Sequence, residues 1–151
     1  MQEDSPLYEA QEELKRVSHS LTVTLKYTRT CDVIKSIVRR LIVTFDYGMI
    51  ALMEDLHRKK KVKTIPLTPF SRAEETKKHF ARDLMMQDYI NFYLLLKKID
   101  TAEFTKREEF RKNVTLVVMQ DDEVIEVDVP MLQGYYAKTK EFIIYLQEKF
   151  F

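Results

Sequence analysis

Few side chains in this sequence can bind a metal ion or act as a nucleophile. There are three histidines, His19, His57 and His79, and a single cysteine, Cys31. No two histidines lie four residues apart beside a carboxylate, which is the spacing of a zinc site on a helix. Cys31 has no histidine near it in the sequence, so we interpret it as a small buried side chain rather than a reactive thiol. The sequence therefore predicts neither a metal ion nor a cofactor.

A polar segment between two apolar stretches is the first candidate binding site. Residues 26–32 bring Tyr27, Arg29 and Asp32 close together in the chain. An arginine and a tyrosine can hold a phosphate or a carboxylate through charge-assisted hydrogen bonds. The same residues can also form a turn between two helices with no further role. The segment is therefore either a ligand site or a simple connection.

A basic run is the second candidate site. It comprises Arg58, Lys59, Lys60, Lys61 and Lys63. Such a run can contact the phosphates of RNA or DNA. It can also be the end of a helix, where cations complement the helix dipole. A second basic cluster within residues 106–112 would strengthen the nucleic-acid interpretation only if the fold brings the two clusters together.

Hydrophobic periodicity predicts the helices that position these residues. Apolar residues at alternating steps of three and four predict a helix from Ser5, with Pro6 at its first position, to a turn at 28–32. A broader apolar stripe predicts a second helix over residues 34–56. The two prolines within residues 66–69 predict a loop after it.

Two further helices are predicted from capping boxes, in which a hydroxyl and a glutamate three residues later satisfy free N–H groups. The box from Ser71 to Glu74 predicts a third helix that continues to about Lys98. The box over residues 105–108 predicts a short helix that ends near Lys112.

The pattern then changes from helical to alternating. Two β-rich runs around an acidic turn at 120–122 predict a β-hairpin over about residues 114–129. Pro130 suits the first position of a last helix. The sequence thus predicts a mainly α fold: an antiparallel bundle of four to five helices with a short β-hairpin before the C-terminal helix. It is expected to be one domain over residues 1–151.

The order of elements over residues 5–113 resembles that of the HEPN superfamily of small helical proteins. Many of its members are ribonuclease toxins, and others are relatives that have lost the activity and act as binding modules. The hallmark of the family is an arginine followed after four to six residues by a histidine, and Arg72 and His79 have this spacing. Arg107 and Asn113 have a similar spacing, but asparagine stands in place of the histidine. The resemblance implies an RNA-cleaving site at Arg72 and His79.

Composition limits the class of protein. With 45% hydrophobic residues the chain is expected to form a packed core. Its 25 Lys and Arg balance 24 Asp and Glu, so the overall charge steers it toward neither nucleic acid nor membrane. No apolar run reaches the roughly 18 residues of a membrane-spanning helix. A single cysteine suits a reducing compartment, and we expect a cytoplasmic protein with no membrane partner.

Three hypotheses for the function follow. The favoured one is a non-enzymatic interaction or binding module that forms a homodimer or binds a protein partner. The alternative is a HEPN-like RNA-binding protein or ribonuclease that uses Arg72, His79 and the basic run at 58–63. The third is a small-ligand site made by Tyr27, Arg29 and Asp32. Which of these side chains the fold brings together distinguishes the three.

Overall fold

The computed structural model describes residues 5–151. The first helix, α1 (Pro6–His19), begins where the Ser5 hydroxyl accepts a hydrogen bond from the Tyr8 N–H at 3.1 Å. A capping hydroxyl satisfies one of the free N–H groups of the first turn, and proline at the first position loses no hydrogen bond. The start of this helix is therefore where the sequence predicts it.

The first helix contains a π-helical turn. α1 runs without a break through η1 (Ser20–Thr24) into α2 (Leu25–Tyr27). A π-helical turn holds one residue more than an α-helical turn, so it changes which side chains face the core. Leu25 is consequently buried. The alternation of three- and four-residue steps that begins at Leu7 predicts Leu21 and Thr24 on the inner face, but both are only half-buried.

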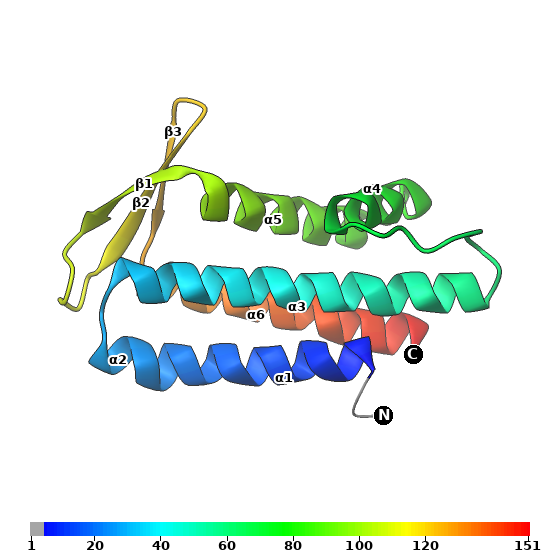
Figure 1. Ribbon diagram of the computed structural model, residues 1–151, viewed down its shortest axis with the longest axis horizontal. Helices are drawn as coiled ribbons and strands as arrows, with labels where there is room; N and C mark the ends of the chain where they lie inside the picture. Colours follow the sequence, from blue (N-terminus) through cyan, green and yellow to red (C-terminus); the bar gives the residue numbers. More distant parts are fainter. Residues whose placement is uncertain (1–4) are drawn as a thin grey trace.

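The turn predicted at 28–32 is confirmed and ends at Thr30. The Thr30 hydroxyl accepts a hydrogen bond from the Val33 N–H at 3.3 Å and caps α3 (Cys31–Arg58). Figure 1 shows α3 running through the middle of the molecule, with α1 on one side and α5 on the other. α3 packs against α1, α5 and α6, which explains why its predicted apolar stripe is broad.

The third predicted helix is in fact two helices. The N-cap of α4 (Pro69–His79) is Thr68 and not Ser71, because the Thr68 hydroxyl accepts a hydrogen bond from the Ser71 N–H at 3.1 Å. α5 (Leu84–Thr101) begins at Asp83, whose carboxylate accepts the Met86 N–H at 3.0 Å. A side chain that caps a new helix competes with continuation of the preceding one.

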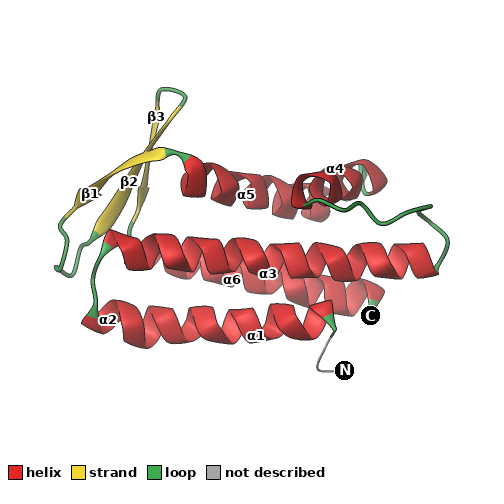
Figure 2. Ribbon diagram, in the orientation of Figure 1, coloured by secondary structure: helices red, strands yellow, loops and turns green. Residues whose placement is uncertain are grey.

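The short helix predicted at 105–112 is wrong, because residues 105–107 belong to a strand and residues 108–112 form a loop. β1 (Glu103–Arg107) pairs antiparallel with β2 (Thr115–Gln120), and β2 pairs antiparallel with β3 (Glu123–Val127). The predicted hairpin is therefore present as β2 and β3, within a three-stranded sheet at one end of the bundle (Figure 2).

The β2–β3 turn has the geometry of a two-residue hairpin loop. Asp121 and Asp122 both have positive φ, at 48° and 65°. Two consecutive left-handed residues are typical of a type I′ turn, which aspartate tolerates better than most residues. The acidic turn predicted at 120–122 is confirmed, although it lacks the usual glycine.

The last helix, α6 (Val129–Phe150), packs against α3 and α1. Phe45 of α3 stacks on Phe142 of α6 with ring centroids 4.6 Å apart. At Gly48 the two helices approach so closely that an added Cβ would lie 2.8 Å from the Phe142 ring. One apolar cluster joins these helices to the inner face of the sheet, so the predicted mainly α fold with strands before the last helix is confirmed.

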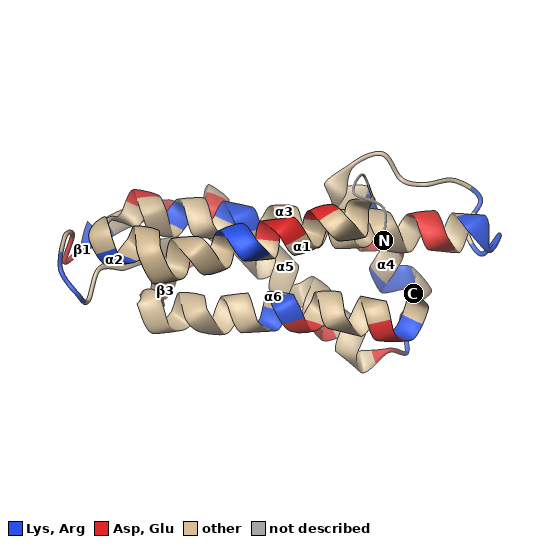
Figure 3. Ribbon diagram, turned by 90° about the horizontal axis from the view of Figure 1, so that it is seen from below, with Lys and Arg blue, Asp and Glu red and all other residues tan. Residues whose placement is uncertain are grey.

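Charged residues of both signs are distributed along the helices (Figure 3). None of the helices within residues 5–151 combines the length and the apolar character needed to cross a membrane.

Candidate functional site

The loop after β1 and the turn before α3 meet at the sheet end of the bundle. The Phe110 N–H donates a hydrogen bond to the Arg29 carbonyl at 2.6 Å. The Glu109 carboxylate accepts the Cys31 N–H at 3.0 Å, at the first turn of α3, where the helix dipole favours a negative charge. These two bonds fasten the β1–β2 loop to the start of α3.

The fastened loop has a strained backbone. Glu108 and Phe110 have positive φ, at 55° and 67°, in the left-handed region that costs a non-glycine residue about 1–2 kcal/mol. Such strain persists only where surrounding contacts impose it, and it is frequent at functional sites. The contacts of Glu109 and Arg29 impose it here.

A pocket of about 340 Å³ lies beside this loop, and we call it the sheet-end pocket. One wall comes from the end of the first helix and the turn that follows it, and the other from the β1–β2 loop and the start of α6. Its principal lining residues are Leu21, Lys26, Arg29, Lys112, Asn113 and Pro130. The fold thus joins residues that are far apart in the sequence.

The sheet-end pocket carries uncompensated positive charge. Within residues 5–151, Lys26, Arg29 and Lys112 form no ion pair with a carboxylate. Asp32 lies instead 3.8 Å from Lys106, which also lies 3.5 Å from Glu109. The turn residues Tyr27, Arg29 and Asp32 therefore do not form one site. Arg29 lines the pocket, whereas Asp32 pairs with Lys106.

Two exposed aromatic rings accompany the pocket. Tyr27 is 78% exposed and Phe110 is 77% exposed. Both lie within two residues of the bond between the Arg29 carbonyl and the Phe110 N–H, so they occupy the same end of the molecule. Sequence reasoning found Tyr27 but missed Phe110, whose only signal is an aromatic residue within a strongly charged stretch.

The basic run at 58–63 forms the other end of α3. Asp55 lies 2.8 Å from Arg58 and 2.8 Å from Lys59, so these two cations share one carboxylate. Lys60 ends the helix with φ of 60°, and Lys61 and Lys63 are exposed. The run lies about 40 Å along α3 from the sheet-end pocket at 1.5 Å per residue, so the fold does not bring the two basic clusters together.

Arg72 and His79 lie on α4 but do not form a shared centre. An Arg72 guanidinium nitrogen donates to the Pro66 carbonyl at 3.3 Å. His79 is exposed, with its ring edge-on to Phe80 at 4.8 Å. No hydrogen bond between Arg72 and His79 occurs in the described part of the chain.

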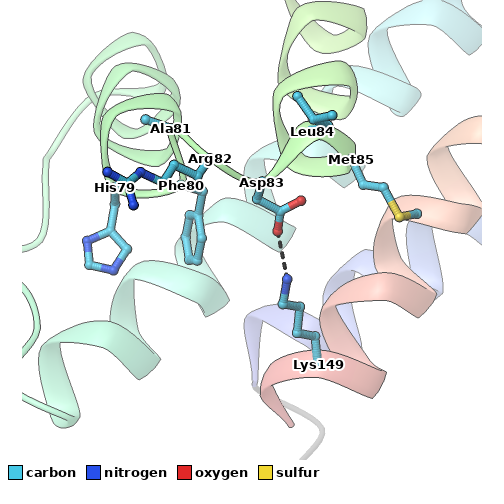
Figure 4. Close-up of a pocket in the computed structure, with 8 residues that line it drawn as sticks. All are labelled: His79, Phe80, Ala81, Arg82, Asp83, Leu84, Met85 and Lys149. Atoms are coloured by element: carbon cyan, nitrogen blue, oxygen red, sulfur yellow. Dashed lines mark hydrogen bonds and ion pairs between the residues drawn. The ribbon is translucent and has the colours of Figure 1, made fainter.

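His79 does border an open hollow of about 820 Å³ between the α4–α5 turn and α6 (Figure 4). Asp83 and Lys149 are paired there: Lys149 donates to Asp83 at 2.8 Å and to the Tyr145 hydroxyl at 2.7 Å, and Tyr145 donates to Asp83. Burial alone would raise the pKa of Asp83, but hydrogen bonds from Lys149, Tyr145 and the Met86 N–H lower it overall. We interpret this network as a structural tie.

A partly buried polar pair lies between α3 and α5. The Tyr93 hydroxyl donates to Asp46 at 2.6 Å, and burial followed by this bond raises the pKa of Tyr93. Burial also raises the pKa of Asp46, which the charges of Lys97 and Arg72 partly oppose. Residues 5–151 contain no group of three or more His, Cys, Asp or Glu side chains placed to hold a metal ion.

The sheet-end pocket is lined by unpaired cations, and the exposed rings of Tyr27 and Phe110 lie at the same end of the molecule outside its lining. The resemblance to the HEPN superfamily stays a prediction that rests on element order and one Arg–His spacing. A comparison with known proteins found no family model, no curated protein and no solved structure that matches this chain.

Proposed function

We propose that this protein is a non-enzymatic binding module that takes a single-stranded nucleic acid at its sheet-end pocket. The observation that carries the proposal is the placement of Lys26, Arg29 and Lys112 without carboxylate partners, beside the exposed rings of Tyr27 and Phe110. A positively charged groove next to aromatic side chains is the usual arrangement for binding single strands. The proposal unites the binding-module and RNA-binding hypotheses.

Each part of the site has a separate task. The three cations bind backbone phosphates, and Arg29 can bind two phosphate oxygens at once through its planar guanidinium group. Unpaired bases stack on the two aromatic rings, each stack contributing about 1–3 kcal/mol. A duplex keeps its bases stacked on one another, so it can offer only its phosphates to this site.

The charge contribution is tested by the salt dependence of binding. The affinity of fluorescently labelled oligouridylate is measured by anisotropy over a series of salt concentrations. Contacts to three phosphates predict a slope of about −2 in the logarithm of affinity against the logarithm of salt, and Arg29→Gln should reduce it by about 0.7. Lys140→Gln, an exposed lysine in the middle of α6, is the matched control and should leave the slope unchanged.

The aromatic contribution is tested with Tyr27→Ala and Phe110→Ala. Loss of one stack should weaken binding about 5- to 150-fold. Phe151→Ala, which removes a half-exposed ring at the other end of the molecule, should have no effect. Absence of salt-dependent binding, or the same affinity in the Arg29→Gln protein, would contradict the proposal.

The ribonuclease hypothesis stays a prediction that no observation here favours, because His79 lies exposed beside Phe80 and apart from Arg72. Incubation of the purified protein with RNA, beside a His79→Ala variant, tests it directly. Cleavage that disappears in the variant would establish an enzyme.

Self-association and a cytoplasmic location are also still predictions. Size-exclusion chromatography with light scattering would measure the molar mass in solution, and a mass twice the 18.1 kDa of the chain would establish the homodimer.

A further inference from the structure

The loop between α3 and α4 is the most basic segment of the chain. Residues 56–73 contain six Lys and Arg and no Asp or Glu. Arg58 and Lys59 share the carboxylate of Asp55, whereas Lys60, Lys61 and Lys63 form no ion pair within residues 5–151. Figure 3 shows this basic turn at the tip of α3, and Figure 1 shows it at the end of the bundle away from the sheet.

This loop and the first turn of α4 expose two large apolar side chains. Leu67 is 92% exposed, more than any other large hydrophobic residue in the described part of the chain, and Phe70 is 63% exposed. We call Lys60, Lys61, Lys63, Leu67 and Phe70 together the loop-end surface. An exposed leucine or phenylalanine gains about 1.5–3 kcal/mol on full burial, so such a pair favours an apolar partner.

The loop is anchored, although its tips are exposed. Val62 and Ile65 pack against the core, the Pro66 carbonyl accepts a hydrogen bond from Arg72 at 3.3 Å, and Thr68 caps α4. Val62 and Ile65 anchor the loop to the core, whereas Leu67 and Phe70 are exposed to solvent. The exposed pair is therefore presented by a fixed backbone.

We propose that the loop-end surface docks on an anionic lipid bilayer. The three free lysines bind lipid phosphates, and Leu67 and Phe70 enter the boundary between headgroups and acyl chains. An aliphatic Leu67 offers no face on which a base can stack, which separates this surface from the sheet-end pocket. Lysine is depleted in the cores of protein interfaces, which argues against a protein partner.

This proposal goes beyond the proposed function and uses the opposite end of the molecule. The sequence predicts no membrane partner because it contains no apolar run of spanning length, and none of the described helices could span a bilayer. Contact with a bilayer surface needs no such helix, since a basic cluster and a few inserted side chains are sufficient.

Co-sedimentation of the full chain with lipid vesicles tests the proposal. Binding is expected to vesicles of phosphatidylcholine mixed with phosphatidylglycerol, to fall as salt is added, and to be absent with phosphatidylcholine alone. Each free lysine should contribute about fivefold to the partition coefficient, so Lys60→Gln, Lys61→Gln and Lys63→Gln together should weaken binding about 100-fold.

The apolar pair has its own variant and control. Leu67→Ser with Phe70→Ser should weaken binding to the same vesicles at least tenfold, and Leu84→Ser should not, although Leu84 is 82% exposed on the α4–α5 turn. All of these side chains are exposed, and circular dichroism is expected to show unchanged folding.

Three outcomes would overturn the proposal. One is no sedimentation with either vesicle, and another is equal sedimentation with both. The third is loss of oligouridylate binding in the triple lysine variant to the extent seen with Arg29→Gln, which would make the loop-end surface part of the nucleic-acid site. Oligouridylate binding that persists in this variant while vesicle binding is lost supports the lipid surface.

Discussion

If the sheet-end pocket binds a nucleic acid as we propose, Glu109 should control the affinity without touching the ligand. Its carboxylate accepts the Cys31 N–H at 3.0 Å, and a hydrogen bond to a charged group stabilises by about 1.5–3 kcal/mol. The bond between the Phe110 N–H and the Arg29 carbonyl adds about 1 kcal/mol. The left-handed Glu108 and Phe110 cost about 1–2 kcal/mol each. The closed loop is therefore only slightly favoured.

We expect Glu109→Ala to open the loop and to weaken oligouridylate binding about tenfold. Loss of the Glu109 bond makes the free energy of loop closure less favourable by at least about 1.4 kcal/mol. Once the open loop predominates, this change lowers the fraction of closed molecules about tenfold. An open loop no longer holds Phe110 and Lys112 beside Arg29. Anisotropy measures the affinity, and urea unfolding should show a loss of similar size in the free energy of unfolding.

Glu108→Ala is the matched control for this experiment. It removes the same negative charge from the same loop, but the Glu108 side chain makes no ion pair within residues 5–151. Loss of charge alone should strengthen binding to an anionic strand, because less repulsion remains. If both alanine variants strengthen binding by similar amounts, Glu109 acts only through its charge and the fastening argument is refuted.

Other features of the structure give further expected outcomes. Gly48→Ala should lower the free energy of unfolding by about 1 kcal/mol, since its Cβ would lie 2.8 Å from the Phe142 ring. Gly134→Ala should raise it by about 0.5–1 kcal/mol, because nothing lies within 4 Å of the new Cβ; thermal unfolding of both variants compares them. Lys60→Gly should stabilise the protein by about 1 kcal/mol in urea unfolding, because Lys60 follows the C-cap of α3 with φ 60°, which glycine adopts without strain. The folded pKa of Asp83 is lowered, so its network stabilises the protein above the unfolded pKa of about 3.9, and this contribution disappears as the pH falls through the folded pKa. Asp83→Asn keeps the helix cap, so the free energy of unfolding should then depend less on pH below about 4.

The elements with a regular hydrophobic period could be predicted from the sequence. The helices that begin at Pro6, at Cys31 and after Asp128 were found, as was the β2–β3 hairpin. The break before α5 was not, because Phe80 and Leu84 keep a helical spacing across it while Asp83 caps a new helix. Contacts between elements decide where such a break occurs, because helix propensity and hydrophobic period depend only on residues that are neighbours in the sequence.

The candidate site could be predicted only in part. Tyr27 and Arg29 attracted attention because polar residues interrupt an apolar pattern. Their partners depend on β1, which carries no clear alternation and was mistaken for a helix. The bond between Cys31 and Glu109 spans 78 positions of the chain, so no local pattern could indicate it.

The length of α3 has a consequence for how the two ends of the molecule act. Its 28 residues extend about 42 Å, whereas electrostatic fields in physiological salt decay over about 8 Å. Two polyanions, one at each end, would therefore barely repel each other. Under the two proposals, the protein holds a nucleic-acid strand at one end and a lipid surface at the other. Its affinity for each ligand is then the same whether or not the other ligand is bound. Anisotropy with oligouridylate should accordingly give the same dissociation constant in the presence and absence of phosphatidylglycerol vesicles.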